Sequence, residues 1–211
     1  MNLTLEAMEK DEYWIVCEHI QKARFADVDI LAAALEDFGL VDLAVIAQQT
    51  KRRLEFLDHL DALDQNPATL EKEMHKALDT NLWVFGPQYS MMASNKTLAR
   101  TIEEYTGKKF SGKRADKRPD LFLAQDAQNM YLLIEFKRPT DEVGRDAEAQ
   151  AKKYRDDLTP NFGKIVILII GGTVDSKMAS QYADSGVNFL SYKAVISRAR
   201  QSLEWLLKEL A

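Results

Sequence analysis

Two charged residues close an otherwise apolar run, and their spacing suits chemistry at a shared site. The segment LLIEFKRP places Glu135 and Lys137 directly after Leu132, Leu133 and Ile134. Side chains alternate between the faces of an extended strand, so Glu135 and Lys137 are expected to project to the same side. A charge buried without compensation is costly, and a metal ion bound by carboxylates is one way to compensate it. The pair indicates a carboxylate and an amine acting together at the end of a buried strand.

A second carboxylate, Asp120, precedes Glu135 by fifteen positions. A β-hairpin spans this separation easily, which would place both carboxylates at neighbouring strand ends. Carboxylate oxygens together with water suit Mg²⁺, and Mn²⁺ is expected to substitute for it. Lys137 would then orient or help to deprotonate an attacking water and offset the charge of a pentavalent phosphate. Each piece alone has a structural alternative, because Glu-x-Lys can be a surface ion pair and Pro119-Asp120 an ordinary turn.

Further candidate side chains lie on two predicted helices. Gln150 and Tyr154 are four residues apart on the helix after the Lys137 strand, so they share one face and can reach the same site. Upstream, a helix predicted over residues 69–80 carries Glu73 at the edge of its apolar face, where it could supply another carboxylate. Glu71 is the alternative to Glu73, and a solvated helix face is the structural alternative for both.

A locally basic segment, KKFSGKRADKR at residues 108–118, leads directly into Asp120. Its glycine, serine and charge content predicts a loop, and phosphate contacts from such a loop would make nucleic-acid binding salt-dependent. A solvated loop is the alternative. The formal net charge of −5 argues against a protein that coats nucleic acid by charge alone. The predicted nucleic-acid contacts are Lys108, Lys109, Lys113, Arg114, Lys117 and Arg118.

The elements that must position these residues follow from hydrophobic periodicity. The first third is predicted to be helical, with a third helix over residues 42–63, and the turn DQNP at 64–67 separates it from the rest. Beyond the basic loop, strands and helices alternate as in an α/β or α+β domain. We therefore expect a helical segment at 1–65 and a mixed domain at 66–211. The predicted strands are 121–124, 130–136, 164–170 and 187–192, and the predicted helices are 142–157, 175–185 and 193–210.

The composition narrows the compartment. An apolar fraction of 46% and a charged fraction of 29% are those of a soluble globular protein. The longest apolar run is far below the roughly 20 residues of a membrane span, so no membrane contact is expected. Cys17 is the only cysteine, which excludes an intrachain disulfide and suits a reducing cytoplasm.

The combined motifs resemble a known superfamily. Glu73 on a helix, Pro119-Asp120, Glu135-Phe136-Lys137 and Gln150-x-x-x-Tyr154 look like those of the PD-(D/E)XK nucleases. The run EKEMHKALDTNLWVFG, followed by RPDLFL and LLIEFKRP, resembles more narrowly the Shedu-type nuclease domain of bacterial anti-phage defence. Related domains also end larger proteins that carry a histidine-kinase-like ATPase module. The resemblance covers about residues 66 to 192.

This resemblance implies a restriction-endonuclease-like fold, a central mixed sheet flanked by helices, and metal-dependent cleavage of DNA. Asp120, Glu135 and Glu73 would hold Mg²⁺, Lys137 would serve the water, and Gln150 with Tyr154 would assist. A homo-oligomer formed through the N-terminal helices, and an ATPase module or partner, are expected with it. The alternative is a catalytically inactive nuclease-like module that binds nucleic acid or assembles a defence complex.

Overall fold

The computed structural model describes residues 39–86, 89–125, 130–176, 178 and 186–209. The chain divides into two compact units, Met1–Phe56 with Ser202–Ala211 and Leu57–Gln201. The first two helices expected in the N-terminal third lie outside the described residues, and the third is present as α4 (Leu40–Gln65). This helix ends where the sequence predicts the end of the helical segment, but the units divide nine residues earlier. All of the candidate site residues belong to the second unit.

The second unit is built on a five-stranded mixed sheet of order β1-β2-β3-β5-β7. The strand β2 (Leu121–Gln125) pairs antiparallel with β1 (Tyr89–Ser94) on one side and with β3 (Met130–Phe136) on the other. The strands β5 (Ile165–Gly171) and β7 (Val187–Ser191) run parallel to β3. The expected mixed sheet is confirmed, and β3 is the strand at which the pairing changes from antiparallel to parallel.

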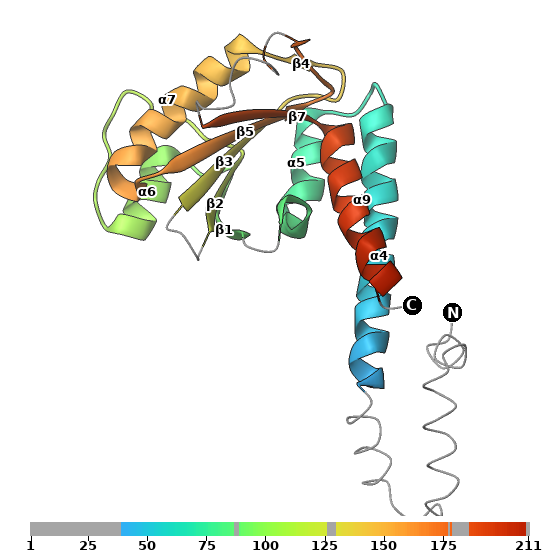
Figure 1. Ribbon diagram of the computed structural model, residues 1–211. Coiled ribbons are helices and arrows are strands. Elements are labelled where there is room, and N and C mark those ends of the chain that lie inside the picture. The colour runs from blue at the N-terminus through green and yellow to red at the C-terminus, as the bar shows by residue number, and fades with distance from the viewer. Residues whose placement is uncertain (1–38, 87–88, 126–129, 177, 179–185, 210–211) are drawn as a thin grey trace, which may run out of the picture. The chain divides into compact units, whose positions relative to one another are not determined.

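Helices flank both faces of this sheet (Figure 1). Parallel strands need a crossover connection, and α7 (Arg145–Phe162) supplies it between β3 and β5. It packs on those two strands and on α6 (Leu98–Thr106), whereas α5 (Glu71–Asp79) contacts β3 from the other face. Odd-numbered residues of β3 such as Leu133 join the core beneath α7. Alternation therefore directs Glu135 toward α7 and Phe136 toward α5.

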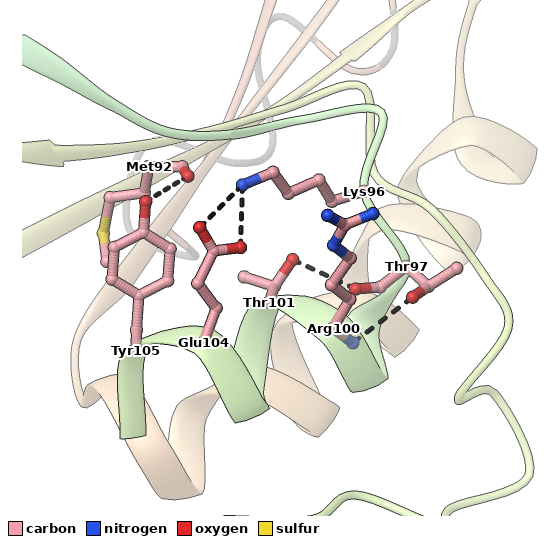
Figure 2. A network of polar contacts seen from close by, with 7 residues as sticks. All are labelled: Met92, Lys96, Thr97, Arg100, Thr101, Glu104 and Tyr105. Atoms are coloured by element: carbon pink, nitrogen blue, oxygen red, sulfur yellow. Dashed lines mark hydrogen bonds and ion pairs between the residues drawn. The ribbon is translucent and has the colours of Figure 1, made fainter. Parts of the chain in front are cut away.

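Helix α6 is fastened to the edge strand β1 by polar contacts (Figure 2). At its start, the Thr97 hydroxyl accepts a hydrogen bond from the Arg100 N–H at 3.2 Å and caps the helix. Near its end, the Tyr105 hydroxyl donates to the carbonyl of Met92 in β1. The Thr97 cap thus begins the helix, and the Tyr105 hydrogen bond ties its last turn to β1.

The remaining elements are helices and two-residue strands outside the five-stranded sheet. The predicted helix 142–157 begins at Arg145, because the two residues before Gly144 form a short strand that pairs with the residues after β5. The helix predicted at 175–185 lies largely outside the described residues. Among the helices that the structure describes, none is both long and apolar enough to cross a membrane. Besides α4 to α7, the described elements outside the five-stranded sheet are the 3-10 helix η1 (Leu82–Phe85), β4 (Glu142–Val143), β6 (Thr173–Val174) and α9 (Tyr192–Glu209).

Gly172, between β5 and β6, is required by a close approach of two backbone segments. A Cβ built at this position would lie 1.7 Å from the carbonyl oxygen of Pro139. The same approach lets the Gly172 N–H donate to the Asp141 carbonyl at 3.0 Å. The turn after Lys137 and the exit of β5 are therefore locked together.

The substitution Gly172→Ala is expected to destabilise the protein by about 2–3 kcal/mol, because backbone must move to admit the methyl group. Chemical denaturation followed by circular dichroism measures this change. Gly144→Ala is the matched control, since a Cβ there would find its nearest neighbour at 3.9 Å. Equal stability of the two variants would show that the loop yields without cost.

Candidate active site

The end of β3 carries the two charged residues that open the sequence argument. Glu135 is 2% exposed and Phe136 is fully buried, so the strand keeps its core character to its last residue. The Lys137 N–H donates to the Ile170 carbonyl of β5 at 2.8 Å, which extends the parallel ladder by one position. Glu135 and Lys137 leave the same face of the sheet, as the alternation predicts.

Asp120 lies beside Glu135 because of the register of β2 against β3. Leu121 pairs with Ile134, so the residue before β2 meets the end of β3. The Asp120 Oδ2 atom accepts a hydrogen bond from the Phe136 N–H at 2.7 Å. The antiparallel pairing inferred from the fifteen-residue separation is confirmed, and it brings two carboxylates to one point.

Burial and mutual repulsion shape the charge state of this pair. Burial and, to a lesser extent, the neighbouring Asp120 carboxylate raise the pKa of Glu135 to about 9, against the opposing charge of Lys137. Burial also raises the pKa of Asp120, against the hydrogen bond from Phe136 and the charges of His75 and Lys137. Without a cation, Glu135 is therefore protonated at neutral pH.

Gln150 and Tyr154 meet Glu135 from α7. The Gln150 amide Nε2 donates to Glu135 Oε2 at 3.3 Å and to the Tyr154 hydroxyl oxygen at 3.1 Å. Burial raises the pKa of Tyr154, which is 7% exposed, so its phenol stays neutral. The structure brings both residues to the site, and two hydrogen bonds from its Nε2 atom orient the Gln150 amide.

The helix carboxylate at the site is Glu71, in place of Glu73. The exposed Glu73 side chain turns back to accept the Leu70 N–H at 2.7 Å and thereby caps its own helix. Glu71 is half-buried; burial raises its pKa, and it is close enough to Lys137 and Asp120 for their charges to act on it. The prediction that Glu73 completes the carboxylate set is therefore corrected to Glu71.

Two residues that the sequence argument did not assign also reach the site. His75, one helical turn after Glu71, lies with its ring centroid 5.7 Å from that of Phe136, and its Nε2 is 3.0 Å from the Ser94 hydroxyl. Tyr192, fully buried at the start of α9, donates its hydroxyl to the Lys137 carbonyl at 2.7 Å. The spacing of His75 from Glu71 was a usable signal, whereas nothing local to Tyr192 indicated its partner.

Of the predicted basic contacts, Arg114 is paired within the protein and the others are exposed. Arg114 forms a bidentate ion pair with Asp157 of α7, with N–O distances of 2.6 and 2.7 Å. The loop backbone is also tied to the start of α6, because Leu98 N–H donates to the Lys117 carbonyl at 2.8 Å. The loop is thus a fixed wall of the unit. The exposed predicted contacts are Lys108, Lys109, Lys113, Lys117 and Arg118.

Two grooves of opposite charge meet at Gln150 and Asp146. The acidic groove, of about 700 Å³, contains Lys137 and Arg145 but four carboxylates. The basic groove, of about 730 Å³, contains Arg114, Lys117 and Lys153 with Asp146 as its only carboxylate, and Tyr154 lines it. The acidic groove's carboxylates are Asp141, Glu142, Asp146 and Asp175.

The carboxylates at the end of β3 are the available donors for a metal ion. Within the residues that the structure describes, no three His, Cys, Asp or Glu side chains lie close enough to form a metal-binding group by themselves. The Glu135 Oε1 atom is buried and, among those residues, has no hydrogen-bond partner. A buried acceptor without a partner costs free energy that a cation would recover. Two or three carboxylates with one such oxygen fit a hard cation that retains several waters.

Comparisons with known proteins found likenesses among solved structures. No protein-family model and no curated protein matches the sequence. A repair endonuclease from Pyrococcus abyssi is similar in structure with a TM-score of 0.41 and 16% identity, over 60% of this chain and 48% of that one. An EndoMS–dsDNA complex is similar with a TM-score of 0.41 and 17% identity, over 58% and 44%. The chain thus spans less than half the length of either structure.

Glu135→Gln is expected to stabilise the metal-free protein at pH 8 by about 1–2 kcal/mol. Because the pKa of Glu135 is higher in the folded state, wild-type stability falls as the pH rises from the unfolded pKa toward about 9. Gln does not titrate, so the advantage of the variant should vanish near pH 4. Urea denaturation in EDTA at both pH values measures it.

Glu104→Gln is the control for this measurement. Glu104 is exposed, and its ion pair with Lys96 at 2.8 Å lowers its pKa (Figure 2). Its neutral variant should gain no stability at pH 8. A Glu135→Gln variant that is no more stable than wild type at pH 8 would contradict the raised pKa.

Tyr192→Phe is expected to cost about 1 kcal/mol of folding free energy, because the Lys137 carbonyl loses its partner. The ring still packs on Phe136, so the variant should fold. Thermal denaturation measures the loss, and an unchanged midpoint would show that the hydroxyl does not hold the Lys137 backbone.

Proposed function

We propose that this chain is a metal-dependent DNA endonuclease that hydrolyses phosphodiester bonds at the end of β3. The observation that supports it most is the buried Asp120–Glu135 pair beside Lys137, in which one oxygen of Glu135 has no partner among the described residues. A purely structural site would satisfy that oxygen or replace the residue with an apolar one. A cation is the partner that this arrangement suits.

Asp120, Glu135 and Glu71 would hold Mg²⁺, or Mn²⁺ in its place. When bound, the ion would lower the pKa of a coordinated water and neutralise charge on the phosphate. Its arrival requires loss of the Glu135 proton, so metal affinity should rise with pH up to about the pKa of that carboxyl.

The chain's own side chains supply the remaining functions. Lys137 would orient the attacking water and offset the negative charge that develops on the phosphate. Its backbone is held at both ends, by Ile170 and by Tyr192, so its ammonium starts from a fixed point. Gln150 holds the Glu135 carboxylate in one orientation, and Tyr154 in turn holds Gln150. Because the fold already positions these groups, little free energy is needed to orient them during the reaction.

The second candidate is a nuclease-like module that binds nucleic acid or assembles a complex without cleaving. The observation in its favour is that no three-residue metal-binding group is preformed among the described residues.

The sequence resemblance adds a cytoplasmic role in bacterial anti-phage defence to the nuclease proposal, together with a homo-oligomer and an ATPase module or partner.

Cleavage of supercoiled plasmid and of linear DNA tests the proposed activity. We expect activity with Mg²⁺ or Mn²⁺, none in EDTA, and a loss of about a hundredfold or more in Lys137→Ala. Nicked and linear products from a closed plasmid would identify an endonuclease.

The matched control is Lys164→Ala. This exposed lysine precedes β5 and so lies at the opposite end of the sheet from Lys137. It should retain full activity. Activity that survives both EDTA and Lys137→Ala would refute the proposal, and DNA binding without any turnover would establish the second candidate.

A further inference from the structure

The basic groove is a built surface with two facing walls. One wall is α7, where Gln150, Lys153 and Tyr154 share a face by their spacing. The other wall is the loop that carries Lys117. This arrangement places the side chains of Lys117 and Lys153 around one groove that meets the acidic groove at Gln150, the residue that positions Glu135.

Arg114 sets the separation of these walls. Its bidentate pair with Asp157 joins the loop to α7 one helical turn beyond Lys153. The Lys117 N–H donates to the Arg114 carbonyl at 3.0 Å, so Lys117 is held in the same turn as Arg114. The charge of Arg114 is therefore neutralised by Asp157 within the protein, whereas the side chains of Lys117 and Lys153 are exposed.

Lys117 and Lys153 are both exposed, and within the described part of the chain neither ammonium forms an ion pair. Exposed lysines along a groove are the usual contacts for phosphate groups. On the other side of Gln150 the acidic groove presents four carboxylates against two cations. A phosphate backbone would be attracted on one side of the catalytic residues and repelled on the other.

We propose that a DNA backbone reaches the catalytic residues through the basic groove alone, with Lys117 and Lys153 contacting phosphates on one flank of the scissile bond. The proposal rests on the proposed function and adds a direction to it. Asp146, which lines both grooves, marks the border and opposes DNA binding.

Fluorescence anisotropy with a short labelled DNA duplex in EDTA, over a series of NaCl concentrations, tests this. The double variant Lys117→Glu/Lys153→Glu should weaken binding at least tenfold, and each lysine should account for about one unit of the salt slope. Lys76→Glu/Lys164→Glu is the matched control. It makes the same charge change at two exposed lysines that line neither groove, and it should bind within about threefold of wild type.

Asp146→Asn provides an arm that misfolding cannot imitate, because it should bind DNA about twofold to fivefold more tightly than wild type. Equal losses in Lys76→Glu/Lys164→Glu and in Lys117→Glu/Lys153→Glu, or wild-type affinity in Lys117→Glu/Lys153→Glu, would overturn the proposal. So would unchanged or weaker binding by Asp146→Asn. Failure of the nuclease proposal is distinct: wild-type protein would bind through the groove and never cleave with Mg²⁺ or Mn²⁺.

Discussion

The Phe136 N–H is the group on which the site depends. The antiparallel ladder between β2 and β3 ends at the Leu121–Ile134 pair, so the next N–H of β3 that points toward β2 has no strand partner. The Asp120 carboxylate takes that place at 2.7 Å. A buried backbone donor must be satisfied, and here the need is met by a side chain that is itself chemically useful. This hydrogen bond holds Asp120 beside Glu135 and so brings two buried carboxyl groups together.

The energetics of this pair favour function over stability. A charge-assisted hydrogen bond favours the ionised form of Asp120, while burial disfavours ionisation of both carboxyls. The Glu135 Oε2 atom receives a long hydrogen bond from Gln150, and its Oε1 atom receives none among the described residues. An apolar residue in its place would improve the core. Retention of a raised pKa at a fixed, partly satisfied carboxyl is the expected signature of a functional site.

The sequence predicted what local periodicity controls. The β3 bounds, the common face of Glu135 and Lys137, and the approach of Gln150 all follow from strand or helix spacing. Glu73 was misplaced although its signal was present: an acid at the third helical position commonly bonds back to the capping backbone N–H. Arg114 and Tyr192 depend on partners 43 and 55 positions away, Asp157 and the Lys137 carbonyl. Such contacts are set by the sheet order, which single-sequence periodicity does not encode.

The net charge of −5 is compatible with a DNA-binding surface once charge is considered locally. Exposed charges farther apart than about 8 Å are largely screened at physiological ionic strength. A phosphate in the basic groove would therefore respond to Lys117, Lys153 and Asp146 far more than to carboxylates elsewhere on the unit. The acidic groove adjoins Gln150 as well, so under the proposed function its repulsion would act near the reacting phosphate and would direct the path of the backbone. An acidic chain could thus bind DNA by keeping its positive and negative charges in separate grooves, and that separation would confine binding to one flank of the proposed active site.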